Sequence, residues 1–140
     1  MAVLALDVGE RRIGVAVSDP EERYALPVAT LERTNLHDDL ETIVALAAEH
    51  RAATIVVGDP IALSGERGLA ARKMDEFAAV LQKAFAGRIE RVDERLTTAQ
   101  ATRTLLADGV SRRKRKAVVD RLAATMILEM YLARRRSRMP

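Results

Sequence analysis

Three carboxylates occupy positions where the surrounding pattern is apolar or where a charge has no obvious partner. Asp7 ends the apolar run of residues 3–6, Asp120 interrupts the stretch AVVDRLAATMILEMYL, and Glu94 follows the weaker apolar run of residues 89–92. Aspartate is depleted from strands, and a buried carboxylate is costly unless it is paired or bound to a cation. Ordinary alternatives are a turn aspartate at position 7, a solvated charge run around position 94, and a helix-start aspartate at position 120.

Acidic side chains that gather at one place predict a site for hard divalent cations. Clustered carboxylates repel one another unless a cation lies among them. The chain has no cysteine, and His37 and His50 lie in a polar stretch of helical pattern, where we expect surface residues. Oxygen ligands favour Mg²⁺ or Mn²⁺. Two such ions held about 3.5–4 Å apart support in-line attack of water on a phosphodiester.

The charge of the chain is divided unevenly along its length. Residues 1–110 carry 13 basic and 18 acidic side chains, a net charge of −5, whereas residues 111–140 carry 10 basic and 2 acidic ones, a net charge of +8. A basic end on an acidic body indicates a polyanionic partner, either nucleic acid or an anionic membrane surface. The run SRRKRK at 111–116 is the best candidate for the contact, with a solvated charge run as the alternative.

The apolar periodicity predicts an α/β fold in which a mixed sheet is covered by helices. We expect strands at residues 3–7, 13–17, 27–34, 54–57 and 89–92, and helices at residues 36–51, 69–85, 97–108 and 116–134. A length of 140 residues predicts one domain, 1–140, with a basic tail from about residue 133. No apolar run approaches the roughly 20 residues of a membrane span, and the N-terminus lacks a signal-peptide pattern, so a cytoplasmic protein is expected.

Four segments together resemble a known family. DVGERRIGVAVSD, GDPIALSGERG, VDERLTTAQATRTLLADGVSRRKRK and VDRLAATMILEMYL are similar, in order and spacing, to the four blocks of the YqgF family of RuvX-type Holliday junction resolvases. The resemblance covers residues 2 to about 132. It implies an RNase H-like fold with a five-stranded mixed sheet, three antiparallel strands followed by two parallel ones. It also implies a nuclease whose divalent ions are bound by Asp7, Glu94 and Asp120.

Members of this family are assigned either to 5′-end processing of precursor 16S ribosomal RNA or to cutting branched DNA. The resemblance therefore implies structured RNA or branched DNA as substrate, with ribosomal precursor particles among the partners. A resolvase makes two symmetric cuts, which would require a homodimer. The predicted nucleic-acid contacts are basic side chains near the carboxylates or in the run 111–116: Arg11, Arg12, Arg95, Arg112, Arg113, Lys114, Arg115 and Lys116.

Three further features of the sequence carry expectations that a structure can test. Asp59 stands where the family usually has leucine, and we expect its carboxylate to be solvated rather than part of the metal site. Gly9 either allows a turn that a side chain would forbid or lets the backbone approach a phosphate. The aromatic residues are scattered and mostly typical of core positions, which favours recognition of backbone or shape over base stacking; they are Tyr24, Phe77, Phe85 and Tyr131.

Two other functional classes remain open from the sequence. Actin-like ATPases and sugar kinases also begin with an aspartate–glycine hairpin, but they need two such domains to enclose a nucleotide. A nucleic-acid-binding module without catalysis would share the basic end and would bind without metal-dependent cleavage.

Overall fold

The computed structural model describes residues 1–60, 68–93 and 112–137, and for residues 112–120 it describes the backbone alone. The helix expected at 97–108 lies outside these residues. The elements, in chain order, are β1 (Ala2–Val8), β2 (Arg12–Ser18), β3 (Ala25–Glu32), α1 (Leu36–Glu49), β4 (Ala52–Asp59), α2 (Leu69–Ala84), β5 (Arg88–Asp93) and α4 (Arg112–Ser137).

A five-stranded mixed sheet in the order β3-β2-β1-β4-β5 forms the centre of the molecule. Strand β1 pairs antiparallel with β2 and parallel with β4, β3 joins β2 antiparallel, and β5 joins β4 parallel. This confirms the predicted fold. Strand β3 begins and ends two residues earlier than expected, because Thr34 and Asn35 serve the start of α1 instead of the sheet. The Thr34 N–H donates to Asp39 Oδ1 over 3.1 Å, and Asn35 Oδ1 accepts from the Asp38 N–H over 2.9 Å.

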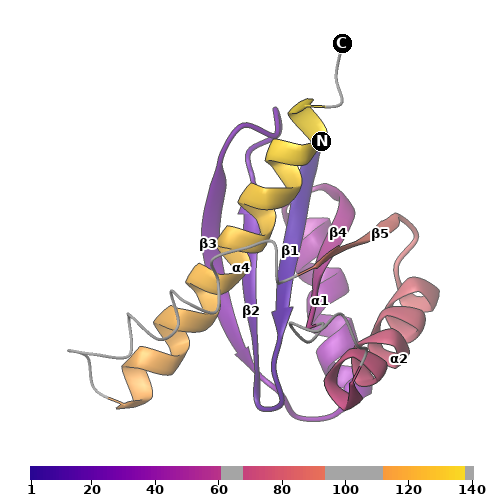
Figure 1. The fold of residues 1–140 in the computed structure, drawn as a ribbon. Coiled ribbons are helices and arrows are strands. Elements are labelled where there is room, and N and C mark those ends of the chain that lie inside the picture. The colour runs from indigo at the N-terminus through magenta and orange to yellow at the C-terminus, as the bar shows by residue number, and fades with distance from the viewer. Residues whose placement is uncertain (61–67, 94–111, 138–140) are drawn as a thin grey trace.

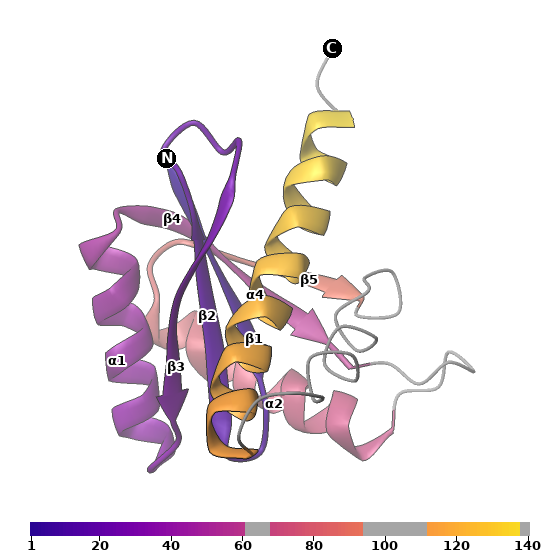
Figure 2. The ribbon, with the colours of Figure 1, turned by 90° about the vertical axis from the view of Figure 1, so that its left-hand side faces the viewer.

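Helices cover both faces of the sheet. Helices α1 and α2 lie on one face and α4 crosses the other (Figure 1 and Figure 2). Each face has its own apolar core. On the α1/α2 face, Leu4, Leu6 and Val57 pack with residues of both helices. On the α4 face, Val3 and Ala5 belong to the core that α4 completes. Among the described helices, none is both long and apolar enough to cross a membrane.

Helix α4 is longer at both ends than the predicted helix 116–134. Its first five residues are the basic residues of the run 111–116, and the residues expected to begin a tail continue as helix through Ser137. Arginine and lysine are good helix formers, and cations in a last turn interact favourably with the helix dipole. The end of the helix is also anchored: Arg135 forms a 2.9 Å ion pair with Glu22 in the β2–β3 connection.

Arg33 ties the turn that follows Asp7 to the helices on the opposite face. Its Nη1 donates to the Gly9 carbonyl oxygen over 2.8 Å, and its Nε lies 3.5 Å from Oδ2 of the buried Asp39. Its guanidinium also lies over the Phe77 ring, 5.7 Å from the centroid. A Cβ on Gly9 would come within 3.0 Å of the Arg12 carbonyl oxygen, so close backbone contact explains the glycine. The β1–β2 turn is therefore fixed both by the Arg33 side chain and by the close contact between the backbones of Gly9 and Arg12.

We predict that Arg33→Met lowers the free energy of unfolding by about 1–3 kcal/mol. The substitution removes the hydrogen bond to the Gly9 carbonyl oxygen and leaves the buried Asp39 carboxylate beside the apolar methionine side chain. Loss of a hydrogen-bonded ionic partner carries a penalty of this size. Urea unfolding followed by circular dichroism measures it. The matched control is Arg72→Met at an exposed arginine of α2, expected within about 0.5 kcal/mol of the unsubstituted protein. Equal stability of the two variants would show that the Arg33 contacts do not hold the turn.

Candidate functional site

Asp7 lies at the carboxyl end of the central strand, and its carboxylate is buried, with 6% of the residue exposed. Side chains alternate between the two faces along a strand. Val3 and Ala5 face α4, so Asp7 faces α4 as well. The sequence prediction that this carboxylate ends a strand covered on both sides agrees with the structure. Asp7 has a polar partner within the fold.

Glycines flank Asp7 on both neighbouring strands. Gly14 of β2 is the register partner of Asp7, and in β4 the pairing of Leu6 with Val57 places Gly58 beside Asp7. By the same alternation, both glycines are on the α4 face, like Ala16 and Val56. Neither neighbour therefore projects a side chain next to the Asp7 carboxylate, whose immediate surroundings within the sheet are backbone.

Asp120 lies in α4 and is placed by the backbone alone. It is the ninth residue of the helix, about two turns from its start, so the expectation of a helix-start residue does not apply. Ala123 and Ala124, three and four residues later, are fully buried, and Ala124 belongs to the core on the α4 face of the sheet. Helix α4 begins at the end of the sheet where β1 ends and runs back towards the start of β1 (Figure 1 and Figure 2). Position 120 thus belongs to the half of α4 nearer the end of β1.

The other predicted site residues are described unevenly. Glu94 and Arg95 lie outside the described residues, directly after the last residue of β5. Arg11 is exposed at the tip of the β1–β2 hairpin, and Arg12 is half-buried at the start of β2. The remaining predicted contacts form the first turns of α4, where the backbone alone is described: Arg112, Arg113, Lys114, Arg115 and Lys116.

The expectation that Asp59 is solvated was wrong. The residue is 7% exposed, and its Oδ1 forms a 2.9 Å ion pair with Nη2 of Arg91. Arg91 also binds Asp75 of α2 over 2.6 Å. Val57, two residues before Asp59, packs in the α1/α2 core, so Asp59 faces α2 and not the face of Asp7. Burial between strand and helix requires a cation beside this carboxylate, and β5 supplies it. Residues 55, 57 and 59 alternate onto one face of the strand, and this pattern in the sequence would have shown that Asp59 faces the same core as Ile55 and Val57.

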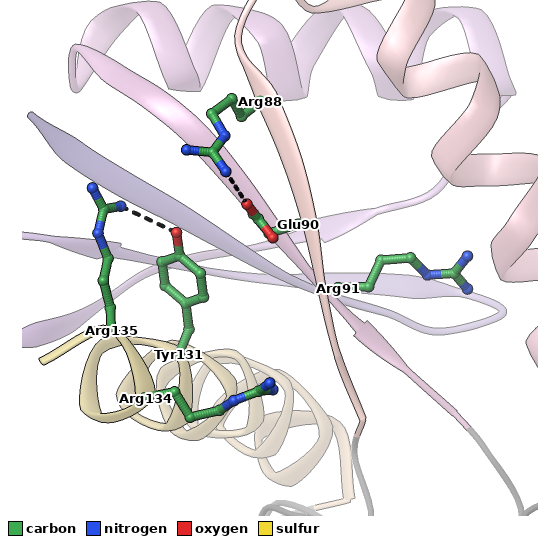
Figure 3. Close-up of a pocket in the computed structure, with 6 residues that line it drawn as sticks. All are labelled: Arg88, Glu90, Arg91, Tyr131, Arg134 and Arg135. Atoms are coloured by element: carbon green, nitrogen blue, oxygen red, sulfur yellow. Dashed lines mark hydrogen bonds and ion pairs between the residues drawn. The ribbon is translucent and has the colours of Figure 1, made fainter. Parts of the chain in front are cut away.

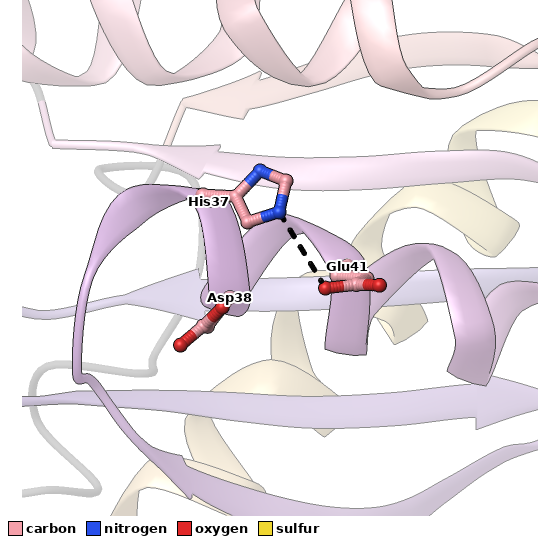
Figure 4. Close-up of side chains that lie close together, drawn as sticks. All are labelled: His37, Asp38 and Glu41. Atoms are coloured by element: carbon pink, nitrogen blue, oxygen red, sulfur yellow. Dashed lines mark ion pairs between the residues drawn. The ribbon is translucent and has the colours of Figure 1, made fainter.

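A second acidic group lies on the first turns of α1. Oxygen and nitrogen ligand atoms of His37, Asp38 and Glu41 lie within 4.8 Å of one another, and all three residues are exposed (Figure 4). The geometry follows from helix capping: Asn35 Nδ2 donates to Asp38 Oδ2 over 2.8 Å, and acids favour a helix N-terminus. Helix α1 covers the face opposite Asp7. This group is therefore explained by the start of α1, and His37 is a surface residue as expected.

Comparison with known proteins gives a consistent result over nearly the whole chain. Residues 1–134 match the family described as "RuvX: Holliday junction resolvase". A protein of Clostridium perfringens with the name "Putative pre-16S rRNA nuclease" is 42% identical over 134 residues, which cover 96% of this chain and 98% of that protein. A Chloroflexus aurantiacus protein of the same name is 43% identical over 135 residues, covering 96% of this chain and 88% of that protein.

A solved structure supports the fold independently of sequence. RuvC of T. thermophilus, in complex with a Holliday junction substrate, superposes with a TM-score of 0.58 at 11% identity, covering 96% of each chain. At that identity the likeness shows the fold alone, and it agrees with the RNase H-like architecture that the sequence resemblance implied. Together with the match over residues 1–134, these relatives show that the chain belongs to the RuvX family, whose YqgF-type sequence blocks it carries.

Proposed function

We propose that residues 1–140 form one divalent-metal-dependent nuclease domain that hydrolyses phosphodiester bonds in the 5′-end processing of precursor 16S ribosomal RNA. The observation that carries the proposal is the buried Asp7 carboxylate at the end of the central strand, flanked by two glycines and facing α4. A carboxylate in this position is at the edge where open α/β sheets bind ligands.

The residues fit hard divalent ions such as Mg²⁺ or Mn²⁺. Asp7 would bind the metal together with Glu94, which follows β5, and Asp120 of α4. All three ligands are carboxylates, the donors that such ions prefer. When bound, the ions lower the pKa of the attacking water and stabilise the leaving oxygen. Gly14 and Gly58 keep side chains of the neighbouring strands away from the Asp7 carboxylate on the α4 face of the sheet.

Basic residues at the same end of the sheet would hold the phosphate backbone beside these carboxylates. Arg11 and Arg12 lie on the hairpin that follows Asp7, Arg95 follows Glu94, and residues 112–116 form the start of α4. Arginine binds phosphate through two parallel N–H donors, which positions a strand as well as attracting it. These groups would thus set the scissile phosphate against the carboxylates and offset the negative charge of the acidic cluster.

The choice of precursor rRNA rests on the names of relatives that are more than 40% identical over nearly the whole chain. Ribosomal precursor particles would then be the natural form of the substrate. The description of the matching family favours a second candidate, cleavage of Holliday junctions. That activity would need a homodimer with two paired sites, since both strands are cut symmetrically.

We predict that Asp7→Asn reduces the cleavage rate by at least about 1,000-fold, which corresponds to about 4 kcal/mol of transition-state stabilisation. Asparagine keeps the shape of the side chain but removes the charge that binds the ion. The control is Glu49→Gln, at an exposed carboxylate near the end of α1, which should cleave at the unsubstituted rate. Circular dichroism and nucleic-acid binding should be nearly unchanged in both variants. Normal cleavage by Asp7→Asn would remove Asp7 from the site.

We predict metal-dependent cleavage that distinguishes the two substrates. The protein, stripped with EDTA, is offered a precursor 16S rRNA fragment and a four-way DNA junction, with and without added Mn²⁺. We expect cleavage only with the metal, and faster cleavage of the RNA. Preferential cleavage of the junction, with two symmetric cuts made by a dimer, would contradict the precursor rRNA proposal and favour the Holliday junction instead. Tight binding of either substrate with no cleavage in Mn²⁺ would favour a binding module without catalysis.

A further inference from the structure

A basic pocket lies between the edge strand β5 and the last turns of α4. Its volume is about 240 Å³, and its lining contains four arginines, one glutamate and one tyrosine. Arg88 and Glu90 come from β5, and Tyr131, Arg134 and Arg135 come from α4 (Figure 3). The side chain of Arg91, the sixth lining residue, turns away towards Asp75 and Asp59 on the other face. None of these residues has a role in the site proposed above.

The α4 wall of the pocket is held in place by ion pairs and hydrogen bonds. Arg135 donates to the Tyr131 hydroxyl over 3.1 Å and pairs with Glu22 over 2.9 Å. The hydrogen bond to Tyr131, reinforced by the Glu22 carboxylate, raises the pKa of Arg135. Tyr131 was expected in the core, yet it is half-buried, with its ring standing between helix and sheet (Figure 3). Arg135 thus acts as a clamp on the tyrosine, and its charge is already matched by Glu22.

Two other arginines are available to a ligand. Arg88, whose side chain is largely exposed, pairs with Glu90 over 2.7 Å, an exposed interaction that a stronger acceptor can replace. Arg134 is exposed on α4 and, within the described part of the chain, its guanidinium makes no hydrogen bond or ion pair. The pocket therefore presents one unmatched cation and one weakly matched cation beside a fixed tyrosine. The Glu90 carboxylate repels a small free anion, which makes no contact elsewhere on the protein to offset this repulsion.

The pocket is on the same face of the sheet as Asp7. Val92 of β5 packs in the α4 core, so Arg88 and Glu90, four and two positions earlier, also face α4. In the sheet register, Arg88 of β5 pairs with Thr54 of β4, and Thr54 pairs with Val3 of β1. Val3 lies four residues before Asp7. With about 3.3 Å per residue and about 4.8 Å per strand, Arg88 and Asp7 are roughly 16 Å apart along the sheet. That span corresponds to about five base pairs of a duplex.

We propose that this pocket is a second phosphate-binding site for the nucleic acid substrate, in which Arg134 and Arg88 bind the backbone about five base pairs from the scissile phosphate at Asp7. The inference rests on the proposed nuclease function and extends it from the metal site to the far end of α4. The site binds backbone phosphates and not bases, so it adds affinity that is independent of sequence and sensitive to salt.

The test is the affinity of Arg134→Gln and of Arg88→Gln/Arg134→Gln for a fluorescein-labelled duplex of about 20 base pairs, made as RNA and as DNA. Anisotropy is measured in EDTA from about 50 to 200 mM salt. We expect the double variant to bind about tenfold more weakly, with a salt slope reduced by about 0.9 for each phosphate that the protein no longer neutralises. The control is Arg72→Gln on α2, exposed on the opposite face. It should match the unsubstituted protein in affinity and slope.

Cleavage kinetics separate this inference from the nuclease proposal. In the presence of Mn²⁺, the double variant should show a raised KM for the cleaved substrate with kcat unchanged, because the pocket is remote from the reacting phosphate. Unchanged affinity, slope and KM in a variant that folds normally would overturn the second site and leave the nuclease proposal standing. Failure of the unsubstituted protein to bind any duplex would overturn both. Thermal stabilisation by inorganic phosphate that the double variant does not show, with duplex affinity unaltered, would assign the pocket to a small anion instead.

Discussion

The alternation of side chains along β1 is the constraint on which the rest of the structure depends. Because this strand is central and covered on both faces, every residue from Val3 to Leu6 must be apolar, and each belongs to one core or the other. After these four residues, Asp7 is the first position at which the strand nears solvent. Its side chain points towards α4, as do those of Val3 and Ala5, because side chains alternate between the two faces. A shift of one residue would send the carboxylate to the α1/α2 face. The register that fills both cores is therefore the same register that orients the candidate ligand.

Helix α4 then determines what else can stand near that carboxylate. Ala123 and Ala124 are small and fully buried, so the helix axis can approach the sheet closely. The far end of α4 is fixed by the Arg135–Glu22 pair and by Arg136, whose Nη1 donates to the Arg23 carbonyl oxygen over 3.4 Å. The middle of the helix packs against the sheet. Its basic first turns and its arginine-rich last turns therefore lie at opposite ends of one helix.

Much of this arrangement could be predicted from the sequence, because local patterns carry it. Apolar runs indicated the strands and the mixed sheet, and the cost of burying a charge singled out Asp7. The partners of buried charges were not predictable. Asp59 meets Arg91, 32 residues away, and Arg33 meets Gly9 and Asp39 across the sheet edge. Such pairs depend on which strand faces which helix, and that is settled by register and packing rather than by local pattern. The length of α4 was underestimated for a related reason at its C-terminal end, since local sequence does not show the contacts of Arg135 and Arg136 with the β2–β3 connection.

The division of charge along the chain has a physical consequence once α4 is in place. An acidic cluster repels the polyanion that it is proposed to cut, so binding energy must come from cations outside the cluster. The fold supplies basic side chains at both ends of one helix: residues 112–116 at its start, and Arg134 with Arg88 of β5 towards its end. With both sites binding phosphate as proposed, the attraction would draw the backbone across the intervening face, where Asp7 lies nearer the first site. Such binding would align a strand along α4, because a phosphate at either end alone would leave the other cations unneutralised.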